Sequence, residues 1–262
     1  MGGFTWHNGC CERRVNVALY QSSAAMSANL SWHDLISQNL AGQSSPGYRA
    51  QIASFDQFRV PGVPGTDPQM TSSYPVFRAQ TLHEQGEVKP TGGKNDLSLD
   101  GPGFFSVRMQ DGTVAYTRDG EFQIDSAGSL KTKDGGLVMG DAGPIRLDPT
   151  AGPIAVNPQG EVSQGGGTKG VLKIVEFKDR GTMQHLSGSY YRPGGTSRSQ
   201  VPQRAATTQI QQGFLEGSNA NSVVEMGNLL MAMRHFEANQ HVLQTADERM
   251  GKSIQEIGTP PV

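Results

Sequence analysis

The 262-residue sequence is poor in cysteine and contains no long hydrophobic run. Its two cysteines, Cys10 and Cys11, are adjacent, so they cannot join distant parts of the chain through a disulfide bond. A membrane-spanning helix needs about 20 consecutive apolar residues, and no such stretch is present. The first 15 residues also lack the apolar segment of a cleaved secretory signal. We therefore expect neither a disulfide scaffold nor direct membrane insertion.

An excess of charge of one sign is also absent. The chain carries 22 Lys and Arg residues against 24 Asp and Glu residues, which gives a formal net charge of −2. Proteins that bind nucleic acid normally gather an excess of basic side chains on one face. We therefore expect no nucleic-acid partner.

The sequence contains none of the common motifs that carry catalysis or bind phosphate. Dinucleotide-binding, P-loop, zinc-protease and nucleophile-elbow patterns are all missing. Cys10 and Cys11 cannot easily present both sulfurs to one tetrahedral metal, and residues 1–14 are predicted to be a disordered extension. His235 and His241 are six residues apart, which places them on different faces of a helix. The sequence therefore predicts no catalytic residue, no metal site and no cofactor.

Glycine and proline are abundant, but they are unevenly distributed. Residues 42–217 contain 28 of the 34 glycines and 13 of the 15 prolines, whereas residues 15–41 contain neither. Glycine and proline interrupt long helices and favour turns. The sequence therefore predicts three parts, in which two helical ends flank a turn-rich middle.

The first helical end, residues 15–48, is predicted to be a helix followed by a turn. Pro46 lacks a backbone donor and moves Ser45 away from helical angles, so the helix should stop before this point. The residues expected on its packing face recur at mixed steps of three and four: Leu19, Met26, Leu30, His33, Ile36 (or Leu35) and Leu40.

The second helical end, residues 213–258, shows a more regular pattern. Its apolar residues follow the alternating steps of heptad a and d positions, and Gln240 and Asp247 interrupt them. Polar groups at such positions lower stability and select a specific partner, so we expect the two terminal helices to pair as a coiled coil. The alternative is that both helices fold back on the middle as a lid. The predicted seam residues are Met226, Leu229, Met233, Phe236, Leu243, Met250 and Ile254.

The middle of the chain has the pattern of short antiparallel strands. Apolar runs recur every eight to ten residues, and turn pairs such as Asp111-Gly112 and Asp134-Gly135 separate them. We predict a connecting segment at 49–92 and a β domain at 93–212 with a flexible loop near 187–204. The fold class is therefore α+β, with an all-β middle domain flanked by N- and C-terminal α-helices.

Three stretches resemble the signatures of the bacterial flagellar rod, hook and hook-associated axial proteins. Residues 38–41 (QNLA) and 45–48 (SPGY) are similar to the family's N-terminal signature, although Gln38, Gly42 and Ser45 depart from it. Residues 101–107 and 115–130 are similar to its middle signature, and residues 213–248 to its C-terminal helix. The motif residues are Asn39, Leu40, Ala41, Pro46, Gly47, Tyr48, Gly101, Gly103, Phe104 and Phe105.

The resemblance implies a structural subunit of the flagellar basal-body rod, of proximal or distal type, and no enzymatic activity. Its terminal helices would pack against those of other copies and form the hollow, helical drive shaft used in motility. It also implies other rod and hook axial proteins and the flagellar type III export apparatus as partners, with a location in the periplasmic rod and no cleaved signal peptide. An alternative is a secreted carbohydrate-binding β module, but Trp6 and Trp32 lie outside the predicted β region.

Overall fold

The computed structural model describes residues 17–60, 72–194 and 201–258, and the side chains of all of these except 17–20, 58–60, 72–74, 253–254 and 256–258. The chain divides into two compact units. The first comprises Met1–His33, Ser54–Arg78 and Leu229–Val262, and the second comprises Asp34–Ala53 and Ala79–Asn228. The predicted disordered extension and both cysteines lie outside the described residues.

The predicted helices at both ends of the chain are confirmed as α1 (Val17–Gly42) and α2 (Ser222–Gly258). At the end of α1, a Cβ atom on Gly42 would lie 2.5 Å from Cδ2 of Tyr48, so this position accepts only glycine without rearrangement. At the start of α2, the Asn221 side chain caps the helix by accepting hydrogen bonds from the N–H groups of Val223 and Val224. Within the described residues, neither helix is long and apolar enough to cross a membrane.

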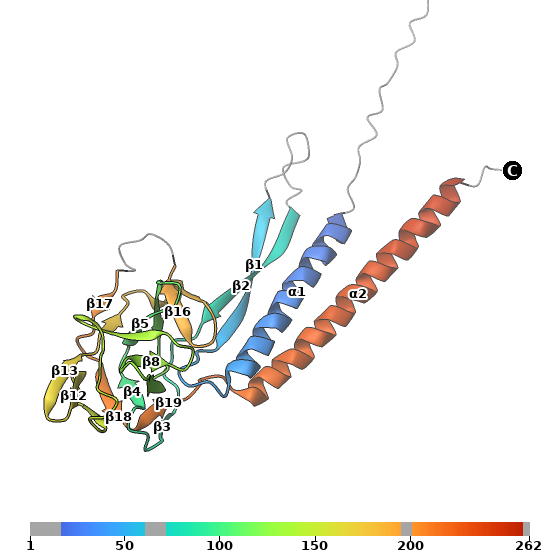
Figure 1. Cartoon of the computed structure of the whole chain (residues 1–262). Coiled ribbons are helices and arrows are strands. Elements are labelled where there is room, and N and C mark those ends of the chain that lie inside the picture. Colours follow the sequence, from blue (N-terminus) through green and yellow to red (C-terminus); the bar gives the residue numbers. More distant parts are fainter. Residues whose placement is uncertain (1–16, 61–71, 195–200, 259–262) are drawn as a thin grey trace, which may run out of the picture. The chain divides into compact units, whose positions relative to one another are not determined.

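In the first unit, α1 and α2 lie side by side and run in opposite directions (Figure 1). Beside them is a two-stranded ribbon of β1 (Gln51–Val60) and β2 (Ser72–Thr81). Trp32 of α1 links the three elements, since its ring lies 5.6 Å from that of Phe55 and 6.0 Å from that of His235. Phe55 in turn contacts Phe77 of β2 at 6.0 Å. A coiled-coil geometry for the two helices stays a prediction.

The second unit holds the antiparallel β structure that the turn pattern predicted. Its largest sheet has ten strands, with the order β15-β16-β6-β5-β9-β8-β7 along its main path and β10, β14 and β17 attached to it. Smaller sheets pair β11-β12-β13, β18-β4 and β19-β3. The strands are β3 (Val88–Pro90), β4 (Leu97–Asp100), β5 (Phe104–Arg108), β6 (Val114–Thr117), β7 (Phe122–Ile124), β8 (Leu130–Thr132), β9 (Leu137–Gly140), β10 (Gly143–Pro144), β11 (Ile154–Val156), β12 (Glu161–Gln164), β13 (Gly167–Val171), β14 (Ile174–Glu176), β15 (Met183–His185), β16 (Tyr190–Pro193), β17 (Gln203–Arg204), β18 (Gln209–Gln212) and β19 (Phe214–Glu216), and a short 3-10 helix covers Arg180–Thr182.

Strand β5 divides the core of the second unit. Successive side chains of a strand point to opposite faces, so Phe104 and Phe105 enter two different hydrophobic clusters. Phe105 packs with Phe122 at 5.0 Å in the larger cluster, whereas Phe104 packs with Phe177 and Tyr191, each at 6.0 Å. The paired phenylalanines therefore anchor both sides of the sheet.

The structure places strands in three segments for which the sequence predicts none. The connecting segment 49–92 contains β1, β2 and β3, although Pro75 lies inside β2 and Pro90 ends β3. The segment 187–204 contains β16 and β17, and residues 195–200 between them lie outside the described part. The first residues of the predicted C-terminal helix form β19, which pairs with β3, and the helix itself begins at Ser222.

Candidate helix junction and assembly surface

Asn39 joins the last turn of α1 to the first turn of α2. Its side chain is fully buried, and its amide donates to Oε1 of Glu225 at 2.8 Å and to the carbonyl of Gln51 at 2.7 Å. Its oxygen accepts from the hydroxyl of Tyr48 at 3.2 Å and from the N–H of Gln51 at 2.9 Å. All four hydrogen-bonding positions of the amide are therefore used. We call the buried polar region formed by Asn39, Glu225, Asn219, Arg49, Arg118 and Glu216 the helix junction.

Asn219 holds the segment before α2 against two other segments of the chain. Its oxygen accepts from the N–H of Ala50 at 2.6 Å, and its amide donates to the carbonyls of Leu82 at 3.1 Å and Glu84 at 2.9 Å. The N–H of Asn219 donates to the carbonyl of Tyr48 at 3.3 Å. One side chain thus ties the segment before α2 to backbone from two distant parts of the sequence.

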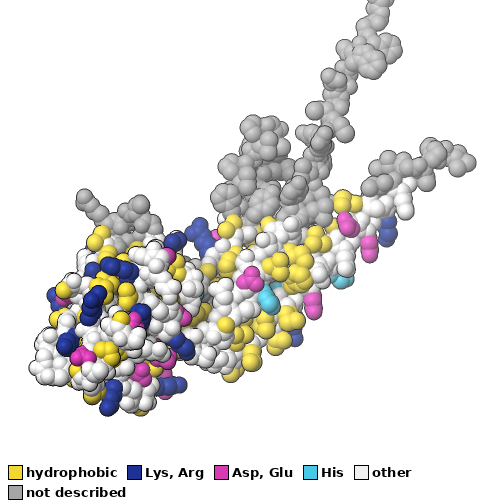
Figure 2. All heavy atoms as spheres, in the orientation of Figure 1, with side chains coloured by type: hydrophobic (Ala, Val, Ile, Leu, Met, Phe, Trp, Pro, Cys, Tyr) yellow, Lys and Arg dark blue, Asp and Glu magenta, His cyan; other side chains and the backbone are white. Residues whose placement is uncertain are grey.

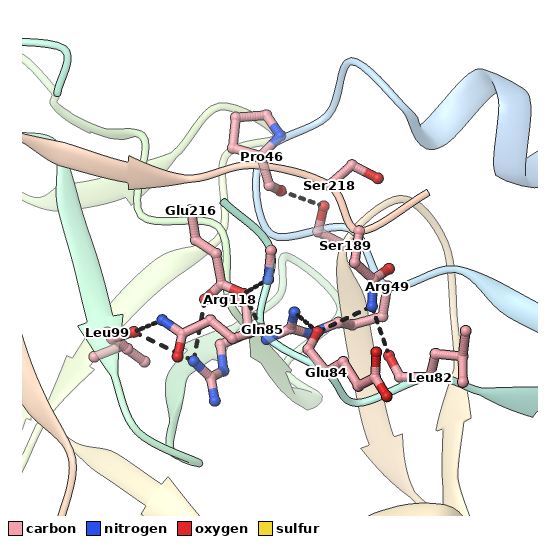
Figure 3. Close-up of polar contacts among 12 residues, drawn as sticks. Pro46, Arg49, Leu82, Glu84, Gln85, Leu99, Arg118, Ser189, Glu216 and Ser218 are labelled. Atoms are coloured by element: carbon pink, nitrogen blue, oxygen red, sulfur yellow. Dashed lines mark hydrogen bonds and ion pairs between the residues drawn. The ribbon is translucent and has the colours of Figure 1, made fainter. Parts of the chain in front are cut away.

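The centre of the helix junction is a buried ion cluster of Arg49, Arg118 and Glu216 (Figure 3). The side chains of the two arginines are 1 % and 2 % exposed, and that of Glu216 is not exposed at all. The carboxylate of Glu216 forms ion pairs with the guanidinium groups of Arg49, at 2.5 Å, and Arg118, at 3.1 Å. It also accepts a hydrogen bond from the N–H of Gly86 at 3.1 Å. Because one carboxylate faces two guanidinium groups, the cluster carries a formal charge of +1.

Backbone carbonyls and an aromatic ring also stabilise the two arginine side chains, which carry the excess positive charge. Arg49 donates to the carbonyl of Glu84, and Arg118 donates to that of Gly101 (Figure 3 shows the cluster among its polar neighbours). The guanidinium of Arg118 also lies 5.1 Å from the centre of the Phe104 ring, within range of a cation–π interaction. Burial lowers the pKa of Arg118 to about 10, while attraction by Glu216 opposes this shift.

His83 lies beside the cluster, between the rings of Phe104 at 6.3 Å and Tyr191 at 6.4 Å. Burial lowers the pKa of His83 to about 4, and the positive charges of Arg180, Arg49 and Arg118 act in the same direction. The imidazole is therefore neutral at pH 7. It fills space next to two buried cations without adding a third charge.

The sequence motif at residues 45–48 is part of the helix junction. Gly47 has φ +66°, and a Cβ atom there would lie 2.4 Å from the backbone of Arg118 and Asp119. The N–H of Gly47 donates to the carbonyl of Glu216 at 2.7 Å, and the carbonyl of Pro46 accepts from the hydroxyl of Ser189 at 2.7 Å. The chain leaving α1 therefore packs directly onto the β domain.

The other motif residues have distinct surroundings. Leu40 is half-buried and Ala41 is exposed. Gly101 has φ +122°, and a Cβ atom on Gly103 would lie 2.7 Å from Cγ2 of Ile174 and Oγ1 of Thr208. These two glycines let the backbone approach its neighbours closely, next to the buried Phe104 and Phe105.

The predicted assembly residues fall into two groups. Ile36 is buried, and Met26, Leu40, Leu229, Phe236, Leu243 and Met250 are half-buried. In contrast, the exposed fractions are 53 % for Leu30, 58 % for Met226 and 51 % for Met233. The side chains of Leu19 and Ile254 lie outside the described residues.

In the single chain, the predicted seam of α2 is partly half-buried and partly exposed. The half-buried face combines Leu229, Phe236, Leu243 and Met250 with the buried Ala232, rather than with Met233. Positions 226, 233, 240 and 247, which the sequence pattern placed in the same seam, are exposed. The polar residues Gln240 and Asp247 therefore do not interrupt the half-buried face.

The sequence assigned no separate role to Arg49, Arg118, Glu216, Asn219 or Glu225, although all of them except Arg49 lie in the stretches that resemble the family signatures. A charged or amide side chain in a turn-rich sequence is normally solvated, and the pattern offers no sign that these five converge. Among the described residues, no group of three His, Cys, Asp and Glu side chains could hold a metal ion. The polar side chains of the helix junction instead bind backbone groups and each other.

The end of α1 and the start of α2 are thus fixed to the β domain through a buried polar network. Comparison with known proteins then gives the family. Residues 98–164 match the flagellar hook protein FlgE/F/G D1 domain, and residues 211–256 match the flagellar basal body rod FlgEFG protein C-terminal region.

Relatives of known name cover most of the chain. The flagellar basal-body rod protein FlgF of Escherichia coli (strain K12) is 30 % identical over 248 residues, which are 91 % of this chain and 97 % of the relative. FlgF of Caulobacter vibrioides is 30 % identical over 230 residues, covering 86 % and 91 %. The rod protein FlgG of Bacillus subtilis (strain 168) is 29 % identical over 246 residues, covering 89 % and 87 %. The chain therefore belongs to the flagellar basal-body rod protein family.

Proposed function

We propose that this chain is a structural subunit of the bacterial flagellar basal-body rod and that it polymerises through its terminal helices into the hollow axial shaft. Relatives named as basal-body rod proteins support the location, because they match nearly the full chain. The family implies assembly with other flagellar axial proteins. A carbohydrate-binding module finds no support among these relatives, and the one described tryptophan, Trp32, lies in α1.

The observation that carries the mode of assembly is the exposed apolar surface of α2. Besides Met226 and Met233, it includes Leu230, which is 61 % exposed, and Met231 and Val242, each 51 % exposed. A helix that is apolar on several sides is normally surrounded by other protein. Copies of the same helix can cover this surface by a repeating contact that does not close, which builds a helical polymer.

Export of the chain before assembly is consistent with a rod subunit. The family resemblance implies passage through the flagellar type III apparatus as an unfolded chain with an uncleaved N-terminal region, followed by folding in the periplasmic rod. The helix junction can form only after residues near 39, 118 and 216 have all emerged, because each contributes a buried polar group. Assembly through the helices would then follow the folding of the β domain.

The substitution Met233→Asp tests the assembly surface. Its side chain is exposed, so the monomer should keep its circular dichroism spectrum and its urea midpoint, whereas rod formation and motility should be lost. The matched control is Gln240→Asp, one heptad further along the same helix, exposed and already polar. Motile cells with Met233→Asp, or equal loss of motility in both variants, would contradict the proposed surface.

A further inference from the structure

Three methionines of α2 are unusually accessible. The exposed fractions are 58 % for Met226 and 51 % for both Met231 and Met233, whereas Met183 in the core of the β domain is only 6 % exposed. Figure 2 shows hydrophobic side chains gathered along the part of α2 nearest its start. Thioether sulfurs on such a surface can be reached by small oxidants before any partner covers them.

The positions of the three methionines along α2 place them on two rows. At 3.6 residues per turn, Met226, Leu230 and Met233 fall on one row, and Met231 and Val242 fall on another. Neither row contains the half-buried residues Leu229 and Phe236. Both rows therefore belong to the exposed apolar surface that other copies would cover in the proposed rod.

We propose that Met226, Met231 and Met233 are sites of reversible oxidation by hydroperoxides, and that this modification blocks assembly of the free subunit. This inference rests on the proposed rod function. In the reaction, the thioether sulfur takes one oxygen atom from the hydroperoxide as the O–O bond breaks, and with hydrogen peroxide the second oxygen leaves as water. The sulfur is oxidised by two electrons to a sulfoxide, and the peroxide is reduced.

The sulfoxide changes the surface because it is polar and needs a hydrogen-bond partner. A thioether can be buried against apolar side chains, and methionine adapts its shape to them. A sulfoxide buried in the same contact without a partner opposes association, and a single such group lowers the association constant by roughly tenfold or more. Methionine sulfoxide reductases return the side chain to the thioether, which makes the block reversible. Assembled copies would be protected because the contact covers the sulfur atoms.

The first test maps oxidation in the purified full-length chain. The unassembled protein is treated with hydrogen peroxide, and sulfoxide at each methionine is followed by peptide mass spectrometry. We expect Met226, Met231 and Met233 to react before Met183, which serves as an internal control in the same molecule. Oxidation of Met183 as fast as that of the three α2 methionines would overturn the inference.

The second test joins oxidation to assembly. Self-association is measured by sedimentation for the untreated chain, the peroxide-treated chain and the treated chain after incubation with methionine sulfoxide reductases. We expect loss of association of at least about tenfold on treatment and recovery after reduction. The variant Met226→Leu/Met231→Leu/Met233→Leu keeps the apolar surface without sulfur, and it should associate with or without peroxide.

The outcomes separate this inference from the proposed function. Equal peroxide sensitivity of the triple leucine variant and the wild type would show that oxidation acts elsewhere and would overturn the inference, while the rod function would stand. If the fully oxidised wild type associates as strongly as the untreated chain, the inference is also overturned and the rod function stands. A chain that does not associate in any state contradicts the proposed function and this inference together.

Discussion

Removal of the single carboxylate in the helix junction should destabilise the whole β domain. Glu216→Gln keeps nearly the same shape but leaves the guanidinium groups of Arg49 and Arg118 buried without a counter-charge. Breaking a buried ion pair by removing one partner costs about 3–5 kcal/mol. Here two arginines lose the same partner, so we expect a cost in this range. A domain of this kind is stable by only about 5–15 kcal/mol, so the loss is a large part of the total.

Urea denaturation followed by circular dichroism measures the effect. With a denaturant slope of about 2 kcal/mol per molar urea, the midpoint should fall by roughly 2 M. The matched control is Glu87→Gln, because Glu87 pairs with Lys89 at 3.2 Å but both side chains are mostly exposed, at 76 % and 65 %. An exposed pair contributes at most about 1 kcal/mol, so this midpoint should barely move.

If Glu216→Gln shifts the midpoint no further than Glu87→Gln, the buried cluster does not stabilise the junction. The carbonyls of Glu84 and Gly101 and the ring of Phe104 would then suffice to hold the two arginines.

Three further predictions concern pH and backbone conformation. His83 has a folded pKa of about 4, below its ordinary value of 6.5, so its contribution to stability is complete above about pH 6.5 and is lost as the pH falls towards 4. The variant His83→Asn should therefore show a weaker dependence of the urea midpoint on pH between 6.5 and 4. The same dependence on pH in the variant and the wild type would contradict this. Burial raises the pKa of Asp119 to about 6, so its charged form opposes folding above that pH; Asp119→Asn should raise the urea midpoint at pH 7 and do so less at pH 4, whereas a lower midpoint at pH 7 would contradict this. Gly47→Ala should destabilise more than Gly112→Ala, because both positions have positive φ, at +66° and +84°, but only a Cβ atom at Gly47 meets other backbone atoms; equal thermal midpoints would disprove the close packing.

The helical ends and the strand-rich middle follow from the sequence for simple reasons. A stretch such as 15–41 that lacks both glycine and proline can form a long helix, and turn pairs at positions such as Asp134-Gly135 divide the middle into short strands. The ribbon of β1 and β2 was missed because the segment is rich in proline, which lacks the backbone donor of a strand; Pro61, Pro64 and Pro68 fall between the two strands in sequence, but Pro75 lies inside β2. The choice of strand partners depends on the folded core and has no local signal.

Periodicity alone does not say which row of α2 is buried within the single chain. Rows through Met226 and Met233, or through Glu225 and Ala232, both alternate correctly with Leu229 and Phe236. Hydrophobicity favours the methionines, but the small Ala232 is the residue that is buried. Tertiary packing selects this face, and it leaves the methionines exposed.

The helix junction could not be predicted at all beyond its motif residues. Asn39 and Gly47 were identified by the family resemblance, but their partners Glu225 and Arg118 are far away in the sequence. Charged side chains are almost never fully buried unless they are paired, and a single sequence does not show which partner pairs with Arg118 or Glu216. Only the fold brings them together.

Electron cryo-microscopy of purified basal bodies can show whether this chain builds the flagellar rod. An epitope inserted at Gly194, next to residues 195–200 in the β domain, can be labelled with antibody fragments in cells that rely on this chain. We expect regularly spaced labels along the rod in motile cells. Intact basal bodies whose rods carry no label, in cells that produce the tagged chain and remain motile, would contradict this expectation.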